Sequence, residues 1–162
     1  MEDSRIAMGG PADLRMHSDA PVRFFTVTEA NALIPRLEQL FRRIDPTLAR
    51  LRELRDLIDD AESYWGDGLV SAPAKDRDAY ADALAEQSDL ERSVQATIDE
   101  IHALGCELKD VGRGLVDFPA RIGTEVAYLC WQRGEDRLGW WHTLEAGFAG
   151  RKALTPEPEP ER

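Results

Sequence analysis

The sequence predicts a mainly α (α+β) protein in which a long antiparallel helical hairpin carries a small C-terminal antiparallel β-meander. Apolar residues recur every three or four positions along two long segments, and a glycine-containing connector lies between them. After Gly114 the apolar spacing changes to the two-residue period of β-strands. With 162 residues, the chain has the length of one domain. We expect residues 24–154 to form that domain, with the hairpin at 24–106 and the β-module at 107–154.

The two ends of the chain show no apolar period. Residues 1–23 mix glycine, proline, aspartate and serine with scattered apolar residues, and residues 155–162 are rich in proline and glutamate. Such compositions bury too little apolar surface to offset the loss of chain entropy. Both segments are therefore predicted to be disordered, and His17 is predicted to be an exposed histidine.

The first helix is predicted to begin at a capping box, in which the side chains of Thr26 and Glu29 each satisfy a free backbone N–H. Pro35 is expected to kink this helix, and the Asp45-Pro46 pair could break and restart it. The apolar residues of the helix form one stripe: Leu33, Leu37, Leu40, Phe41, Ile44, Leu48, Leu51, Leu54 and Ile58.

The second helix is predicted over residues 76–104, after a connector at 61–75 and with Gly105 as its C-cap. Its stripe comprises Tyr80, Leu84, Leu90, Val94, Ile98, Ile101 and Leu104. Folding the chain back near Leu69 sets this stripe against the first one, apolar against apolar almost throughout. The pattern therefore predicts a long antiparallel hairpin with arms of about 45 Å.

Three short segments rich in β-forming residues follow, at 115–119, 125–131 and 138–143. Turns that contain glycine separate them, so we expect a three-stranded antiparallel meander followed by a loop at 145–154. One register places a set of side chains on a common face: Ala127, Leu129, Trp131, Leu138, Trp140 and His142. Tyr128 and Trp141 then share the opposite face. A slip of one residue would exchange the faces, because side chains alternate along a strand.

The motifs FTVTEANALIPRL, GLVDFPA and YLCWQRGEDRLGWWHTLEAGFAGR carry a family resemblance. With them the chain resembles, over residues 25–154, an uncharacterised bacterial family known only as a domain of unknown function. Asp136 stands where the family pattern suggests a proline, and Cys106 where it suggests an aliphatic residue. The resemblance implies that a site lies among these motifs, but it implies no activity.

Composition limits the partners. The formal net charge is −11 and the isoelectric point is about 4.7, so nucleic acids and anionic membranes are poor partners. The same charge favours metal ions and basic protein surfaces. The longest apolar run, Val126–Trp131, is too short to cross a bilayer, and the first twenty residues lack the pattern of a signal peptide. We therefore expect a cytoplasmic protein that binds neither nucleic acid nor membrane.

The first candidate site is one for a divalent transition metal, Mn, Fe or Zn, because imidazole and carboxylate ligands together suit these ions. The ligands that we expect are His142, Glu135, Asp117 and Glu107. The open end of the hairpin would bring Glu29 and His102 close to them as alternative ligands. No HExxH, CxxC or paired ExxH motif accompanies these residues. The alternative is that His142 is only hydrogen-bonded beside tryptophans and that Glu135 occupies a turn.

The second candidate site is an apolar pocket for a small organic anion. Arg151 would bind the anionic group with two hydrogen bonds, and Lys109 belongs to the same predicted set. The walls would come from aromatic residues: Tyr128, Trp131, Trp140, Trp141 and Phe148. These rings could equally form the core of the meander, and Arg151 could equally form a surface ion pair.

Other chemistries lack support in the sequence. Cys130 lies in an alternating strand with no basic residue predicted nearby, so we interpret it as a buried structural thiol. No GxSxG motif provides a serine nucleophile. Gly112 and Gly114 precede a strand and no helix, which disfavours a phosphate-binding loop.

The functional hypothesis is a small soluble protein that binds a divalent metal or a small anionic ligand where the hairpin meets the meander. The alternative is a non-catalytic adaptor whose tryptophan-rich module has a structural core. Because two helices with one seam bury little surface, a second copy could pair with the hairpin as a homodimer of coiled-coil type. The sequence does not decide whether a substrate is turned over.

Overall fold

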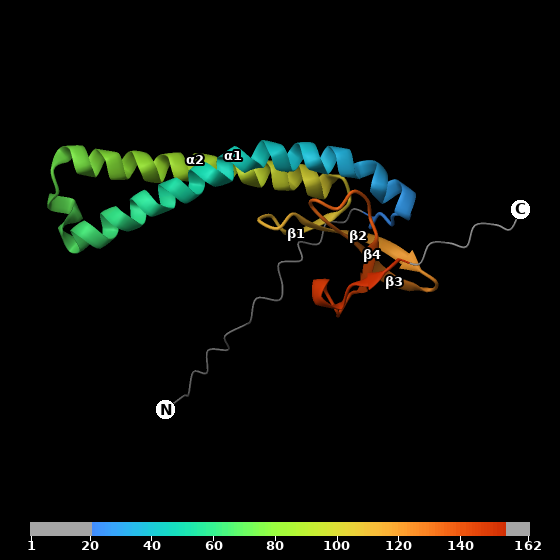
Figure 1. The fold of residues 1–162 in the computed structure, drawn as a ribbon. Helices are drawn as coiled ribbons and strands as arrows, with labels where there is room; N and C mark the ends of the chain where they lie inside the picture. Colours follow the sequence, from blue (N-terminus) through green and yellow to red (C-terminus); the bar gives the residue numbers. More distant parts are fainter. Residues whose placement is uncertain (1–20, 155–162) are drawn as a thin grey trace, which may run out of the picture.

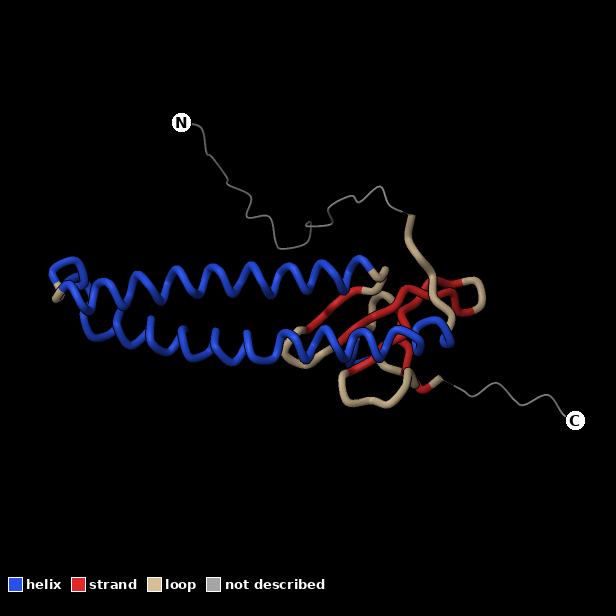
Figure 2. The backbone as a smooth tube through the Cα atoms, turned by 90° about the horizontal axis from the view of Figure 1, so that it is seen from above, coloured by secondary structure: helices blue, strands red, loops and turns tan. Residues whose placement is uncertain are grey.

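The computed structural model describes residues 21–154 and confirms the predicted helical hairpin. Helix α1 spans Val27–Trp65, the short 3₁₀ helix η1 spans Gly66–Ser71, and helix α2 spans Ala74–Ala103. The two long helices lie side by side and run antiparallel (Figures 1 and 2). At one end they flank the β-module, and at the other end, where η1 joins them, they extend well beyond it.

The predicted disorder at the two ends concerns residues that lie outside the described part of the chain. The exception is the segment 21–23, which forms neither helix nor strand. His17 also lies outside the described residues. Within residues 21–154, none of the helices combines the length and the apolar character needed to span a bilayer.

Helix α1 begins where the sequence predicts. The Thr26 hydroxyl accepts a hydrogen bond from the Glu29 N–H at 3.1 Å, and the Glu29 carboxylate accepts one from the Thr26 N–H at 3.2 Å. The helix then continues through Pro35 and Pro46, so the predicted break at Asp45-Pro46 is wrong. Both prolines are exposed, and water can therefore bond to the carbonyl groups that lose an N–H partner.

Polar pairs across the hairpin agree with the predicted register. The Arg50 Nε donates to Glu86 at 2.7 Å, and the Tyr80 hydroxyl donates to Glu62 at the same distance. Much of the predicted stripe of α1 is buried, at Leu37, Leu40, Phe41, Ile44, Leu54 and Ile58. Exposed ion pairs contribute little free energy, so the buried stripe stabilises the hairpin and the polar pairs mark its register.

The β-module is one five-stranded sheet. Its strands are β1 (Glu107–Asp110), β2 (Leu115–Ile122), β3 (Glu125–Gln132), β4 (Trp140–Thr143) and β5 (Lys152–Ala153). Their order in the sheet is their order in the chain, and all neighbours are antiparallel. The predicted meander is thus confirmed at its centre, but the sequence missed both edge strands. The first edge strand reads ELKD and the last has two residues, too few for an alternating apolar signal.

The predicted pairing of β3 with β4 is wrong by one residue. His142 faces Tyr128, not Ala127. The predicted last strand began at Leu138, whereas that residue lies in the loop before β4 and its N–H donates to the Asn31 side chain at 2.8 Å. Because side chains alternate, this slip moves His142 to the face of the sheet opposite to the predicted one.

The inner face of the sheet packs against the first half of α1. Its buried side chains are Val116, Phe118, Ala120, Leu129 and Trp131. The Phe118 ring lies edge-on to Phe25 with 5.2 Å between ring centroids, and the Trp131 ring lies 6.2 Å from Phe41. The α1 residues in this core lie between Ala30 and Phe41, so the distal part of the hairpin is not held by the sheet.

Arg133 ties the end of β3 to the hairpin. Its guanidinium donates to both carboxylate oxygens of Asp45, at 2.7 and 2.8 Å. Its backbone N–H donates to the Gly114 carbonyl at 2.9 Å. At Gly114 φ is +65°, and a Cβ there would lie 2.4 Å from the Cβ of Arg133, so only glycine fits this turn before β2.

Candidate functional site

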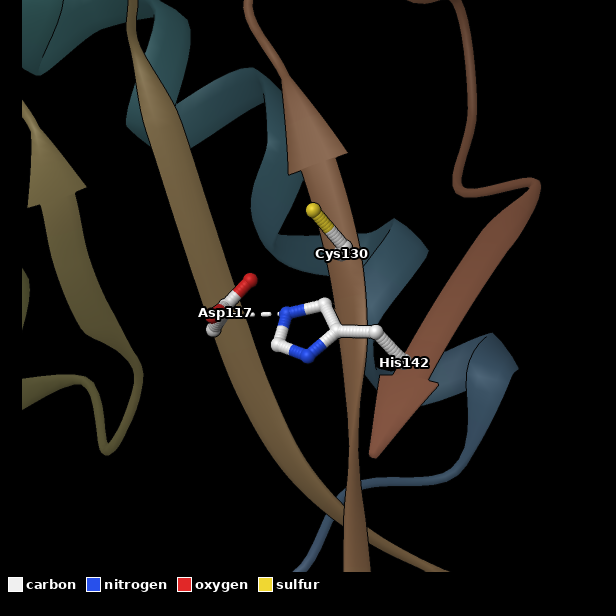
Figure 3. Close-up of side chains that lie close together, drawn as sticks. All are labelled: Asp117, Cys130 and His142. Atoms are coloured by element: carbon white, nitrogen blue, oxygen red, sulfur yellow. Dashed lines mark hydrogen bonds and ion pairs between the residues drawn. The ribbon is translucent and has the colours of Figure 1, made fainter. Parts of the chain in front are cut away.

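The outer face of the sheet, which points away from α1, carries three buried polar side chains. Asp117 comes from β2, Cys130 from β3 and His142 from β4, and their tips converge (Figure 3). Each is at most 3 % exposed. Asp117 and Cys130 face each other directly in the ladder, while His142 pairs with Tyr128, two residues along β3 from Cys130. The cluster therefore lies on the far side of the sheet from the hairpin and not at the predicted junction of hairpin and meander.

The hydrogen bonds of His142 fix its ring. Nδ1 lies 2.8 Å from the carbonyl oxygen of Thr143, which can only accept, so Nδ1 carries a hydrogen and donates. Nε2 lies 3.0 Å from Oδ2 of Asp117. The Tyr128 ring packs beside the imidazole, with 5.5 Å between ring centroids. The imidazole is therefore held with Nε2 directed at a buried carboxylate.

Cys130 completes the cluster. One ligand atom from each of Asp117, Cys130 and His142 lies within 4.8 Å of the others. Burial raises the pKa of the Cys130 thiol to about 12, and the nearby Asp117 carboxylate acts in the same direction. Without a cation the thiol is thus protonated at neutral pH, and it is a poor nucleophile.

A cavity of about 260 Å³ opens onto this cluster. Asp117, Cys130 and His142 line its floor, and Leu115, Leu144 and Phe148 are the apolar side chains of its wall. The remaining polar side chains that line it belong to Lys109 and Tyr128. The cavity therefore combines possible metal ligands, an apolar wall and one ammonium group.

The segment 144–151 covers the outer face of the sheet and carries the short 3₁₀ helix η2 (Phe148–Gly150). In Figure 1 this segment, coloured red, lies on the side of the sheet away from the hairpin. Gly147 lines the cavity with φ of +60°, a conformation that a side chain would strain. The turn at Gly147 brings Phe148 over the cluster.

Arg151 anchors this segment. Its Nη2 donates to both carboxylate oxygens of Glu135, at 2.8 and 2.9 Å, and to the Cys130 carbonyl at 3.3 Å. The guanidinium also lies over the rings of Trp140 and Phe148, 4.9 and 4.7 Å from their centroids. Through Nη2, Arg151 therefore fastens the cover of the cavity to the Cys130 carbonyl in β3 and to Glu135 in the turn that follows this strand.

Lys109, Glu107 and Tyr128 form a polar group at the edge of the cavity. The Lys109 ammonium lies 2.6 Å from the Glu107 carboxylate and 5.1 Å from the centroid of the Tyr128 ring. The Tyr128 hydroxyl donates to Glu107 at 3.2 Å. Burial acts to lower the pKa of Lys109, but the contact with the Glu107 carboxylate outweighs it and raises this pKa, so the ammonium stays charged at neutral pH.

The structure brings together two of the four predicted metal ligands, Asp117 and His142. Glu135 instead pairs with Arg151 and also accepts the Gln132 N–H at 2.9 Å. Glu107 lies beside the cavity with Tyr128 and Lys109 as its partners. The alternative ligands are also elsewhere: Glu29 caps α1, and His102 is exposed in the last turn of α2.

Among the predicted ligand-binding residues, Lys109 lines the cavity and Arg151 lies behind its wall. Trp131 and Trp141 lie on the inner face and pack in the core with α1. Sequence reasoning missed Cys130 as a member of the site. The signal that could have found it is the alternation of β3 and β4 in the register shifted by one residue, which places Cys130 and His142 on one face.

Fold and site define a class: an α+β protein with a helical hairpin, a five-stranded antiparallel sheet and one buried Asp–Cys–His cluster on its outer face. The chain belongs to the family described as an uncharacterized conserved protein (DUF2203), whose sequence model matches residues 23–154. This membership confirms the resemblance to an uncharacterised family. No curated protein and no solved structure matches the chain.

Proposed function

We propose that the protein binds one Zn²⁺ ion through Asp117, Cys130 and His142. The observation that carries the proposal is the contact between Nε2 of His142 and Oδ2 of Asp117 at 3.0 Å. Because Nδ1 donates to the Thr143 carbonyl, Nε2 of a neutral imidazole has only a lone pair to offer. A lone pair and a buried carboxylate oxygen at this distance repel each other unless a cation lies between them.

The dimensions of the cluster fit a metal ion. A tetrahedral zinc ion with bonds of roughly 2.0–2.3 Å separates its ligand atoms by roughly 3.3–3.6 Å. The three side chains already offer ligand atoms within 4.8 Å of one another, so small shifts suffice. The bond from Nδ1 to a backbone carbonyl is also the usual support for a histidine that ligates metal through Nε2.

The ligand types favour zinc among the three predicted metals. A thiolate, an imidazole and a carboxylate form a mixed set that suits Zn²⁺ and also Fe²⁺, whereas Mn²⁺ prefers oxygen ligands. Three protein ligands leave a fourth tetrahedral position free, as in zinc sites that bind water or substrate. The cavity of about 260 Å³ beside the cluster gives that position room for a ligand.

The alternative to zinc is a proton between Nε2 of His142 and the Asp117 carboxylate, which would make the two residues a buried ion pair. The test is metal content and zinc affinity of the full chain, purified without a histidine tag and without chelator. The proposal predicts one zinc per chain and a large loss of affinity in His142→Gln. A protein without bound zinc, or a His142→Gln variant with unchanged zinc affinity, would mean that a proton holds the pair together.

The chain provides matched controls for this experiment. His102 is exposed in the last turn of α2, so His102→Gln should keep zinc affinity. Cys106 is a second buried cysteine, whose Sγ lies 3.3 Å from the Ile101 carbonyl. Cys106→Ala should therefore also keep zinc affinity, while Cys130→Ala should lose it.

The adaptor alternative stays a prediction. One observation weighs against docking through the tryptophan-rich module: Trp131 is fully buried, Trp141 is partly buried in the core, and Trp140 is 38 % exposed. Few apolar side chains of the module therefore remain for a partner. In the buried cluster, by contrast, the contact between His142 and Asp117 requires a cation, and a bound metal ion would supply one.

A further inference from the structure

We propose that the cavity over the Asp117–Cys130–His142 cluster binds a small monocarboxylate with a compact apolar body. One carboxylate oxygen takes the free position of the metal, and the other accepts a hydrogen bond from the Lys109 ammonium. The inference rests on the proposed metal site and names the class of ligand that the site takes.

The size and the walls of the cavity set the body of the ligand. A volume of about 260 Å³ lies just below the usual range for pockets that take drug-sized molecules, so it suits a single ring or a short branched chain. Leu115, Leu144 and Phe148 supply apolar contacts. A ligand with several polar groups would leave some of them without partners against these walls.

The cationic side chain on the cavity wall sets the charge of the ligand. Among the described lining residues this cation is Lys109. Its ammonium has three N–H donors, and the contact with Glu107 at 2.6 Å uses one of them. The guanidinium groups of Arg113 and Arg151 lie near Phe148, at 4.4 and 4.7 Å from its ring centroid, but neither residue lines the cavity. An anion in the cavity therefore finds its hydrogen bonds at Lys109.

The lining also argues for capture of an anion over activation of water. Asp117 and His142 act as metal ligands in the proposed site, so neither is a free base. Tyr128 donates its hydroxyl hydrogen to Glu107 at 3.2 Å, and Lys109 is a cation. The proposed metal ion and the Lys109 ammonium are thus the two groups in the cavity that can bind a carboxylate.

The test uses the full chain loaded with Co²⁺ in place of zinc, because the visible absorption of Co²⁺ changes when its ligands change. Benzoate is the probe, and benzamide is the uncharged control of nearly the same shape. We expect benzoate to change the spectrum in a saturable way and benzamide to leave it unchanged at the same concentrations. Lys109→Met should weaken benzoate binding by about 10- to 100-fold, the range for a hydrogen bond to a charged group.

The matched control is Lys152→Met. Lys152 lies over Trp141, which packs on the inner face, so this variant should bind benzoate as the wild type does. Stoichiometric Co²⁺ without any response to benzoate would overturn the ligand proposal alone. Equal benzoate affinity in Lys109→Met would overturn it as well. Failure to take up Co²⁺, which is read before benzoate is added, would overturn the metal site and the ligand proposal together.

Discussion

The two faces of the central strands differ in what their side chains do. On the inner face, Phe118 and Trp131 are buried against α1 and make only apolar contacts with it. On the outer face, Asp117, Cys130 and His142 are buried as deeply, yet each carries a group that needs a polar partner or a cation. Alternate residues of the same strands therefore separate stability from chemistry, and a substitution on one face should leave the property of the other face largely intact.

The largest effect is expected on the inner face. Trp131→Ala removes a fully buried ring beside Phe41 and should lower the free energy of unfolding by about 3–5 kcal/mol. Urea unfolding followed by circular dichroism measures the loss. Leu144, on the outer face, is 55 % exposed, and Leu144→Ala should change the free energy of unfolding by at most about 0.5 kcal/mol. Similar losses for the two variants would contradict the comparison.

The second-largest loss of stability is expected for a substitution on the outer face, and only when zinc is present. In Asp117→Asn the side-chain amide can donate to Nε2 of His142, so the metal-free protein should keep most of its stability. Zinc at about 100 times its Kd should stabilise the wild type by about 2.7 kcal/mol, and the variant should lose most of this increment.

Urea unfolding of Asp117→Asn, with zinc and with a chelator, separates the two contributions. A variant that unfolds easily in chelator would show that Asp117 stabilises the fold itself. A variant that gains as much from zinc as the wild type would show that Asp117 is not a ligand.

The length and composition of each element explain how much of the fold could be predicted from the sequence. Long stripes such as Leu37 to Ile58 and the capping box at Thr26 depend on neighbours within the helix, so the hairpin could be read directly. The central strands were also recognisable from their composition. The edge strands β1 and β5 were not, because they are short and consist largely of polar residues.

The site could be predicted only in part, because it depends on strand register. Asp117 and His142 were predicted as ligands by residue type, and the structure does bring them together. Cys130 was missed since a one-residue difference between β3 and β4 decides which face His142 shares. The hydrogen bond from the Leu138 N–H to the Asn31 side chain holds Leu138 in the loop before β4. No local pattern in the sequence predicts this bond, because the two residues lie far apart in the chain.

A smaller effect concerns the pH dependence of zinc binding. Burial raises the pKa of the Cys130 thiol to about 12, and zinc binds the thiolate, so binding releases this proton at neutral pH. The affinity should therefore rise about tenfold per pH unit from this group between about pH 6.5 and 9. Competition with a chelator of known affinity measures the slope. Cys130→Ser should bind more weakly with a shallower slope, and an unchanged slope in that variant would contradict the assignment.

The smallest effect is expected where the sheet meets the hairpin at an exposed contact. The hydrogen bonds from Arg133 lower the pKa of Asp45, so the pair stabilises the fold above the ordinary pKa of an aspartate. This contribution is lost as the pH falls through the lowered folded-state pKa. Because both groups are partly exposed, Asp45→Asn should lower the free energy of unfolding by no more than about 1 kcal/mol at pH 7.

Urea unfolding at pH 7 and in acid checks this sign, since the difference between Asp45→Asn and the wild type should shrink in acid. Asp56 is an exposed acid on the same helix without an ion-pair partner among the described residues. Asp56→Asn should change stability less than Asp45→Asn at pH 7. If the two variants changed the free energy of unfolding equally, the ion pair between Arg133 and Asp45 would not stabilise the fold.

The most direct test of the metal centre is X-ray absorption at the zinc edge of the stoichiometrically loaded protein. The proposed ligands predict one sulfur at about 2.3 Å and nitrogen or oxygen neighbours at about 2.0–2.1 Å. The sulfur contribution should vanish in Cys130→Ser and persist in Cys106→Ser. A wild-type spectrum with only nitrogen and oxygen neighbours, or a sulfur contribution that survives in Cys130→Ser, would contradict a zinc ion held by Asp117, Cys130 and His142.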